Sequence, residues 1–234
     1  MAATGDQFDS ALDLLRRLDP KRTALNVSRI CSLVPDLTED LLASVDQPLE
    51  SRRCRKSGRD YLICDYNRDG DSYRSPWSNE FDPPLSDGTV PSERVRKMEE
   101  KANEAFDIYR DLYYEGGISS VYFWNLDDGF AGVVLLKKTA PRTGQSSGAW
   151  DSIHVFEATE RARTSHYKLT STVILHLSSG RAGEMDLSGN MTRQVEQDLA
   201  VDGDAAHIAN VGKVSDDDVV VFQEGQTADG IVMG

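Results

Sequence analysis

The sequence predicts an α+β protein with an N-terminal antiparallel helical bundle, an irregular stalk, one helix and then a five-stranded antiparallel sheet. Three observations support this prediction. Apolar residues recur with helical spacing through residues 1–50 and again through 92–117. From residue 118 the apolar spacing changes to two, which is typical of strands. Residues 51–91, between the two helical regions, are rich in turn formers and show little periodicity.

The composition is that of an ordinary globular chain with an acidic balance. Of its 234 residues, 39% are hydrophobic and 28% are charged, and the formal net charge is -13. Such a charge repels nucleic acid and anionic membrane and favours partners with basic surfaces. The polar start MAATGDQFDS does not resemble a secretion signal, and no apolar run approaches the roughly 18 residues that cross a membrane. Three cysteines without C-x-x-C spacing indicate reduced thiols, as in the cytoplasm. Together with the charge and the lack of a long apolar run, they lead us to expect a cytoplasmic protein that neither spans a membrane nor binds nucleic acid.

Proline residues divide residues 1–50 into three short helices. The stripe from Phe8 to Leu18 has the spacing of an amphipathic helix, and Pro20 ends it. A second apolar stripe stops at Pro35, and a third, with a start like a capping box, stops before Pro48. Short helices with tight breaks predict an antiparallel bundle.

The stalk, residues 51–91, interleaves aromatic residues with turn formers. A loop of this length is usually functional or bound against another surface. The helix expected over 92–117 has a stripe for burial that includes Val95, Met98 and Ala102, and the pair Gly116-Gly117 ends it.

Residues 118–198 predict a sheet that is apolar on both faces. In its first strand Tyr122 and Trp124 alternate with Val121 and Phe123, whereas a sheet with one wet face would alternate between apolar and polar residues. We therefore expect one covering layer from the helical half of the chain and the other from a second polypeptide. The expected strands span about 118–126, 130–138, 150–159, 165–177 and 184–196.

Two short motifs imitate functional sites but lack the required context. Asp65, Asn67 and Asp69 resemble the opening of an EF-hand loop, but Pro76 occupies the twelfth position, where a bidentate Glu belongs. A hydrogen-bonded turn is the better interpretation. Residues 144–148 match the G-x-S-x-G string, which needs a strand before it and a helix after it. Here a loop precedes the string and a strand follows it.

The remaining candidate groups give no active site. The histidines stand apart without helical pairing or a nearby cysteine, and no glycine-rich phosphate loop is present. We therefore predict a binding protein with no enzymatic activity, cofactor or metal. The histidines are His154, His166, His176 and His207.

One basic cluster lies at the start of the stalk. A solvated charged loop is its commoner interpretation. The alternative is a contact with an acidic protein or with phosphoinositide headgroups. The cluster consists of Arg52, Arg53, Arg55, Lys56 and Arg59.

From Asp60 to Asn79 the sequence reads DYLICDYNRDGDSYRSPWSN, which closely resembles the signature of the actin filament capping protein beta subunit family. Further strings agree with this family in the same order, over about residues 6–213. Long matching strings in one order are highly specific. The strings are ALDLLRRL, LTEDLLASVDQPL, YRDLYYEGGISSVYFW, WDSIHV, HYKLTSTVILHL and HIANVGK.

The resemblance implies the same fold, completed by a long C-terminal helix laid across the sheet. It implies an alpha subunit of similar fold, whose sheet joins this one edge to edge, which would protect an exposed edge from aggregation. A C-terminal tentacle of each subunit would bind the fast-growing (barbed) end of an actin filament as a helix in a groove, without calcium, and block subunit exchange. The implied location is the cytoplasm, in the cortical actin cytoskeleton.

After Lys213 the sequence departs from the family. Residues 214–234 are poor helix material, so within the C-terminal segment 199–234 we expect an atypical, disordered tail in place of the long helix and tentacle. The alternative function is then a non-capping variant that dimerises with the alpha subunit but lacks the actin-binding tentacle. Without the covering helix, the isolated chain is expected to be marginally stable.

None of the family's main actin-contacting positions can be matched in this sequence, but a regulatory surface can. Arg17, Asp46 and Asp65 match family positions that contact basic regulatory peptides. The carboxylates of Asp46 and Asp65 would complement a basic peptide. The structural alternatives are a helix-surface charge for Arg17 and a turn cap for Asp65.

Overall fold

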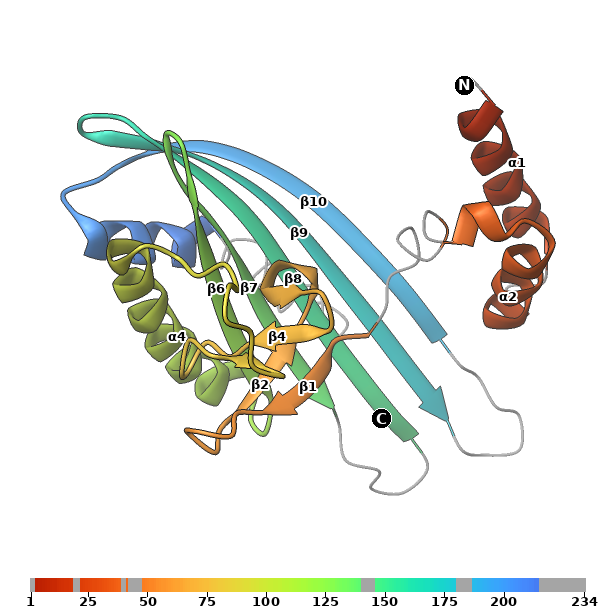
Figure 1. Ribbon diagram of the computed structural model, residues 1–234, viewed down its shortest axis with the longest axis horizontal. Helices are drawn as coiled ribbons and strands as arrows, with labels where there is room; N and C mark the ends of the chain where they lie inside the picture. The colour runs from red at the N-terminus through yellow and green to blue at the C-terminus, as the bar shows by residue number, and fades with distance from the viewer. Residues whose placement is uncertain are drawn as a thin grey trace, which may run out of the picture. The chain divides into compact units, whose positions relative to one another are not determined.

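The chain divides into two compact units, residues 1–47 and 48–234, which are drawn in Figure 1. No helix of the described part is long and apolar enough to cross a membrane. The computed structural model describes residues 3–18, 22–38, 41, 48–139, 146–179 and 187–214.

The first unit is helical, as predicted. Helix α1 (Ala3–Arg17) and helix α2 (Thr23–Leu33) are followed by the 3-10 turn η2 (Pro35–Leu37). The apolar stripes meet in a small core of Ala11, Ile30, Leu37 and Leu41, with Phe8, Leu12 and Leu15 packed against it. The third predicted helix falls largely on 39–40 and 42–47, which lie outside the described residues.

The stalk contains two small sheets that the sequence analysis did not anticipate. Strands β1 (Glu50–Arg53) and β2 (Asp60–Ile63) form an antiparallel hairpin. The 3-10 turn η3 (Asp65–Asn67) leads into a three-stranded sheet. Gly70, between the first two strands of that sheet, has a φ of +57°, a conformation that favours glycine. The three strands are β3 (Arg68–Asp69), β4 (Ser72–Arg74) and β5 (Phe81–Asp82).

Helix α4 (Glu93–Tyr113) occupies the predicted range. The Ser92 hydroxyl accepts a hydrogen bond from the Val95 N–H and caps its first turn. At the other end Gly116 has a φ of +73°, which lets the chain turn toward the sheet. The helix buries Val95, Met98 and Ala102, as the sequence predicted, together with Phe106.

The main sheet is the predicted antiparallel meander of five strands, in the order β10-β9-β8-β7-β6 (Figure 1). Strand β8 starts at Ser146, a few residues before the expected position, and β10 continues to Ala200. Gly132 is required in β7, because a Cβ there would lie 2.5 Å from the Phe123 ring. The strands are β6 (Ile118–Leu126), β7 (Gly129–Thr139), β8 (Ser146–Glu160), β9 (Thr164–Ser179) and β10 (Leu187–Ala200).

The sheet separates two apolar cores, as its two-sided pattern predicted. On one face Val121, Phe123 and Phe156 pack against α4. On the other face Tyr122 packs with Val133 and Leu135 of β7, with the stalk residue Leu62 and with Leu49 just before the stalk. Over β6–β8 the second layer therefore comes from the chain's own stalk. The expectation that a second polypeptide supplies this layer is wrong for that part of the sheet.

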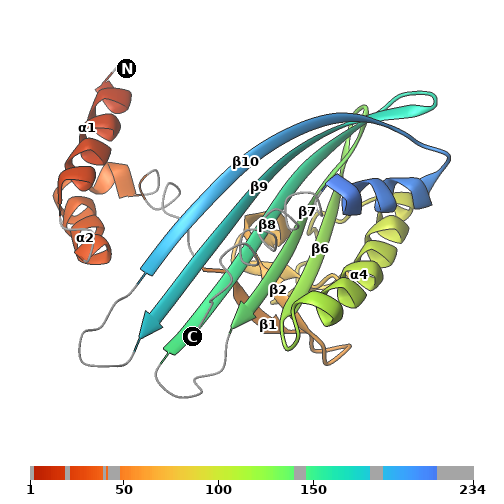
Figure 2. The same ribbon diagram turned by 180° about the vertical axis from the view of Figure 1, so that it is seen from behind.

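A helical segment over 204–214 lies beside α4, and both views show it on the same side of the sheet as α4 (Figure 2). Its residues His207, Val211 and Val214 are buried. The sequence analysis placed the string HIANVGK ahead of a missing helix. In the structure this string forms a helix, and the atypical tail from residue 215 onward lies outside the described residues.

Candidate functional site

Strand β10 forms one border of the main sheet, and we call its outer side the open edge. All its residues, Leu187 to Ala200, pair with β9 in continuous register. Among the described residues no strand pairs with its other side. A long strand with unpaired N–H and C=O groups is a template for pairing with another chain. Figures 1 and 2 show α4 over the opposite border, beside β6.

The two faces of β10 differ in polarity. Met191, Val195 and Leu199 point to the face that carries α4, alternating with the exposed polar residues Arg193 and Gln197, and Val195 and Leu199 pack against that apolar core. The opposite face presents Asn190, Thr192, Gln194, Glu196 and Asp198, all exposed. The apolar core thus reaches the border of the sheet on one face only, at Val195 and Leu199.

An ionic network joins the segment 204–214 to the sheet and to α4. Arg94 of α4 donates hydrogen bonds to Glu160 of β8 at 2.7 Å and to Asp204 at 2.9 Å. His207 Nδ1 lies 2.7 Å from the Tyr167 hydroxyl, and its Nε2 lies 3.3 Å from Glu160 Oε1. Five side chains from α4, β8, β9 and the segment therefore fix its position.

The network has opposite effects on its two bases. Burial lowers the pKa of His207, and this effect outweighs the nearby Glu160 carboxylate, which would raise it. Hydrogen bonds to Glu160 and Asp204 raise the pKa of Arg94. At neutral pH the histidine is therefore neutral, while the arginine carries the positive charge.

A second network ties the stalk to the main sheet. Glu99 of α4 has no exposure to solvent and accepts two hydrogen bonds from Arg74 of β4, at 2.8 and 2.7 Å. It also accepts the Phe123 N–H of β6 at 2.6 Å and a bond from Arg96. Because one carboxylate holds three elements, the stalk, α4 and the sheet edge form one packed body.

The chain matches the family described as F-actin capping protein, beta subunit, over residues 8–222. It belongs to this family. The match extends past Lys213, where the sequence analysis expected the resemblance to end.

Relatives of this capping protein beta family support the same assignment. The chain is 75% identical over 213 residues to the F-actin-capping protein subunit beta of Aspergillus oryzae, with 90% of this chain and 80% of the relative covered. It is 70% identical to the Gibberella zeae protein of that name, over 91% and 82% of the two chains. The Caenorhabditis elegans protein of that name is 55% identical, over 90% and 79%.

A solved structure confirms the fold class. The homodimeric actin capping protein alpha subunit from Plasmodium berghei superposes with a TM-score of 0.54, over 96% of this chain and 92% of that chain. The sequence identity is 16%, so this likeness concerns the fold alone.

The regulatory positions predicted from the family lie in different parts of the chain. Arg17 is exposed on α1 and forms an ion pair with Asp13 at 3.0 Å. Asp65 belongs to η3 in the second unit, and its side chain is 94% exposed. Asp46 lies outside the described residues.

The basic cluster of the stalk is largely paired within the chain. Four of its five cations contact either a carboxylate or an aromatic ring, which favours a structural role over an anion-binding one. The contacts are Arg59 with Asp107 (2.5 Å) and Trp77 (3.6 Å), Lys56 with Glu80 (2.8 Å), Arg55 with Asp82 (2.9 Å), and Arg52 with Tyr73 (4.4 Å).

Cys54 lies in the hairpin that carries this cluster. Burial acts to raise the pKa of its thiol, but hydrogen bonds with Ser57, Ser75 and Ser78 outweigh it and lower the pKa to about 6. Burial raises the pKa of Cys64 to about 11. Both cysteines are free thiols, as is Cys31.

The EF-hand-like string folds as a hydrogen-bonded turn, as expected. The Asn67 amide oxygen accepts the Cys64 N–H at 2.9 Å, and its amide nitrogen donates to the Arg74 carbonyl at 2.9 Å. The string 144–148 has no described geometry at residues 144 and 145. Of the histidines, His154 contacts Ser171 at 2.8 Å and His166 contacts Asp198 at 2.9 Å, each between neighbouring strands.

The role of His207 as an anchor of the segment 204–214 was not predicted from the sequence. The signal was present, because Ala206, Asn210 and Val214 recur at intervals of four and His207 and Val211 lie beside them. The region was assigned only to the C-terminal segment 199–234, and its helical spacing was not used.

Proposed function

We propose that this chain is the beta subunit of a heterodimeric actin filament capping protein, which binds barbed ends independently of calcium and blocks subunit exchange there. The role is binding without chemistry, at the cytoskeleton in the cytoplasm and, we infer, at cortical actin. Family membership supports the role, and the open edge of β10 is the structural observation that carries it.

The open edge of β10 is evidence for a partner that contributes a sheet of its own. Fourteen residues of β10 present one border to solvent in the described chain, and its apolar face ends there. An alpha subunit of similar fold could extend both the hydrogen-bond ladder and the apolar layer across that border. Pairing along this length would cover backbone groups that otherwise invite aggregation.

Calcium independence is supported by the use of the Asn67 amide within its own turn. Both its oxygen and its nitrogen already bind backbone groups of the stalk. A calcium ion would have to displace these hydrogen bonds. The Asp65 carboxylate beside it points into solvent.

The test is an elongation assay with pyrene-labelled actin, using this chain co-expressed with an alpha subunit. Protection of barbed ends at nanomolar concentration, equal in calcium and in chelator, is the expected result. Co-purification of the two subunits without inhibition would support the alternative of a non-capping variant. Failure of the subunits to co-purify would contradict both.

We also propose that Arg17, Asp46 and Asp65 contact basic regulatory peptides. The high exposure of Asp65 supports a role in recognition, because its ion pair with Arg68, at 3.9 Å, is a weak surface contact that a basic partner can replace. Asp65→Lys should weaken the binding of a basic peptide at least tenfold, whereas Asp69→Lys, on the neighbouring strand, should not. Equal binding by both variants would remove Asp65 from the proposal.

A further inference from the structure

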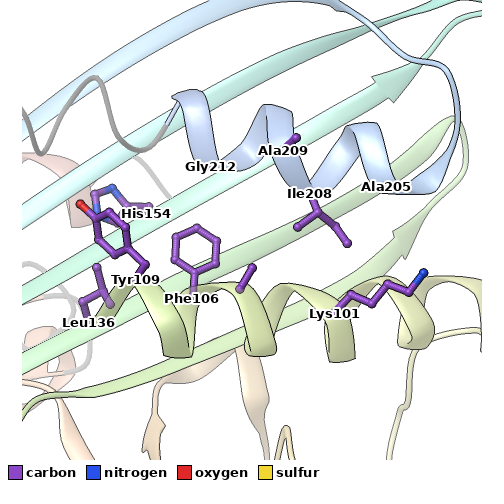
Figure 3. A pocket seen from close by; sticks show the side chains of 10 residues that line it. Lys101, Phe106, Tyr109, Leu136, His154, Ala205, Ile208, Ala209 and Gly212 are labelled. Atoms are coloured by element: carbon purple, nitrogen blue, oxygen red, sulfur yellow. The ribbon is translucent and has the colours of Figure 1, made fainter. Parts of the chain in front are cut away.

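An apolar groove lies between α4 and the segment 204–214. Its volume is about 480 Å³. Phe106, Tyr109 and Leu136 form its floor and wall, and Ile208 and Ala209 line the other side (Figure 3). Figure 3 shows Gly212 at the end near His154 and Tyr109, and Ala205 at the end near Lys101.

The groove continues into exposed apolar side chains of α4. Ile108 and Leu112 are 63% and 71% exposed, and with Ala105 they form a stripe at helical spacing beside the groove. Contiguous apolar surface of this kind on a folded protein marks a place where another segment binds. We therefore expect an apolar segment to bind in this groove.

We propose that residues 219–222 of the same chain, Val-Val-Val-Phe, bind in this groove. The described chain ends at Val214, two residues after Gly212, which lines the groove. The next residues, Ser-Asp-Asp-Asp at 215–218, are turn formers that suit a reversal of direction. The apolar run then starts where the groove opens. This inference does not depend on the proposed function.

The length of the run matches the length of the groove. From Ala205 to Gly212 a helix rises about 10 Å, at roughly 1.5 Å per residue. Four extended residues also span about 10 Å, at roughly 3.3 Å per residue. Because side chains alternate in an extended segment, two of the four enter the groove.

The charges near the end of the groove agree with a run that is directed from Gly212 toward Ala205. A run that starts near Gly212 finishes near Ala205, where Lys101 lines the groove. Glu224 follows two residues after Phe222 and would then lie close to the Lys101 ammonium. The opposite direction would carry Glu224 away from this cation.

Disulfide trapping in the full chain tests the proposal. The variant A209C/V220C places one cysteine in the groove wall and one in the run, and A209C/V232C is the matched control in a second apolar stretch. After mild oxidation at micromolar protein, mass spectrometry of the linked peptides should show the 209–220 link within one chain. Its yield should exceed that of the 209–232 link at least tenfold.

Three results would overturn the proposal. They are equal yields for the two variants, the lack of any 209–220 link, and a link between two chains whose yield rises with protein concentration. The last result would assign the groove to a second copy. A second readout needs no cysteine: Phe222→Asp should increase bis-ANS fluorescence at least twofold, and Val232→Asp should leave it unchanged. An equal rise of bis-ANS fluorescence in both variants would contradict binding of residues 219–222 in the groove.

Discussion

At Glu99 the protein holds a carboxylate without exposure to solvent, and its partners explain why this is tolerated. Arg74, Arg96 and the Phe123 N–H supply hydrogen bonds from three directions. A buried charge with this many partners is stable only while they remain in place. The residue therefore links the stalk to the sheet.

Glu99→Ala should reduce the free energy of unfolding by about 3–5 kcal/mol, because it leaves the buried Arg74 without its counter-charge. The matched control is Glu100→Ala on the same helix, whose exposed carboxylate pairs with Arg96 at 3.1 Å and should contribute less than about 1 kcal/mol. Urea titration of the co-expressed complex, followed by tryptophan fluorescence, measures both. Similar losses in the two variants would show that the buried network does not carry the difference.

His207 predicts a pH dependence of stability. Burial lowers its pKa in the folded chain, so the unfolded chain binds more protons between that lowered pKa and the ordinary value of about 6.5. Stability should therefore be complete above pH 6.5 and fall as the pH drops through that window. Thermal midpoints measured from pH 8 to 5 should show this decline.

The matched variants for this test are His207→Gln and His166→Gln. The first should flatten the decline below pH 6.5, because it removes the buried base, while the second should leave the decline in place. An unchanged pH profile in His207→Gln would assign the dependence to other groups.

Among the elements, β10 carries the open edge and offers a direct test of sheet pairing. Met191 is 45% exposed and lies on the apolar face, in line with Val195 and Leu199. Met191→Asp should raise the dissociation constant for the alpha subunit at least tenfold, about 1.4 kcal/mol. Thr192→Asp, on the polar face of the same strand, is the control and should bind as the parent chain does. Loss of binding in both variants, or in neither, would contradict an interface that continues the apolar layer.

The elements with strong local signals could be predicted from the sequence. Helix α4 follows from its apolar stripe and from Gly116-Gly117, and the meander follows from the change to a period of two. The small sheets of the stalk could not be predicted, because their strands are two to four residues long and are held by tertiary contacts such as that of Arg74 with Glu99. A contact between residues that lie far apart in the sequence produces no local periodicity from which it could be predicted.

The candidate site was partly predictable for the same reason. A two-sided apolar pattern in β6 and β7 indicated cover on both faces, but it could not show that Leu62 of the stalk and the preceding Leu49 provide one layer. The sequence analysis assigned that layer to a second polypeptide. In the structure the surface that suits a partner is the β10 edge and not the face of the sheet, because the backbone of β10 is unpaired on one side within the described residues.

At the scale of the whole molecule, the coverage of the sheet is uneven. Over β6–β8 both faces lie under other parts of the chain, whereas β10 contributes mostly exposed residues. The net charge of -13 opposes self-association at low ionic strength, but it is screened by salt within about 8–10 Å. An open strand edge is then the dominant route to association.

This balance predicts how the chain behaves without its partner. Expressed alone, it should form concentration-dependent oligomers that increase with salt, because screening removes the repulsion while the β10 edge stays available. Co-expressed with an alpha subunit, it should elute as a one-to-one complex whose size does not change with salt. Size-exclusion chromatography with light scattering, at 50 and 500 mM salt, compares the two states directly. A lone chain that stays monomeric at both salt concentrations and ignores the alpha subunit would contradict both the open edge as an interface and the proposed heterodimer, since the β10 backbone groups would then be satisfied without another polypeptide.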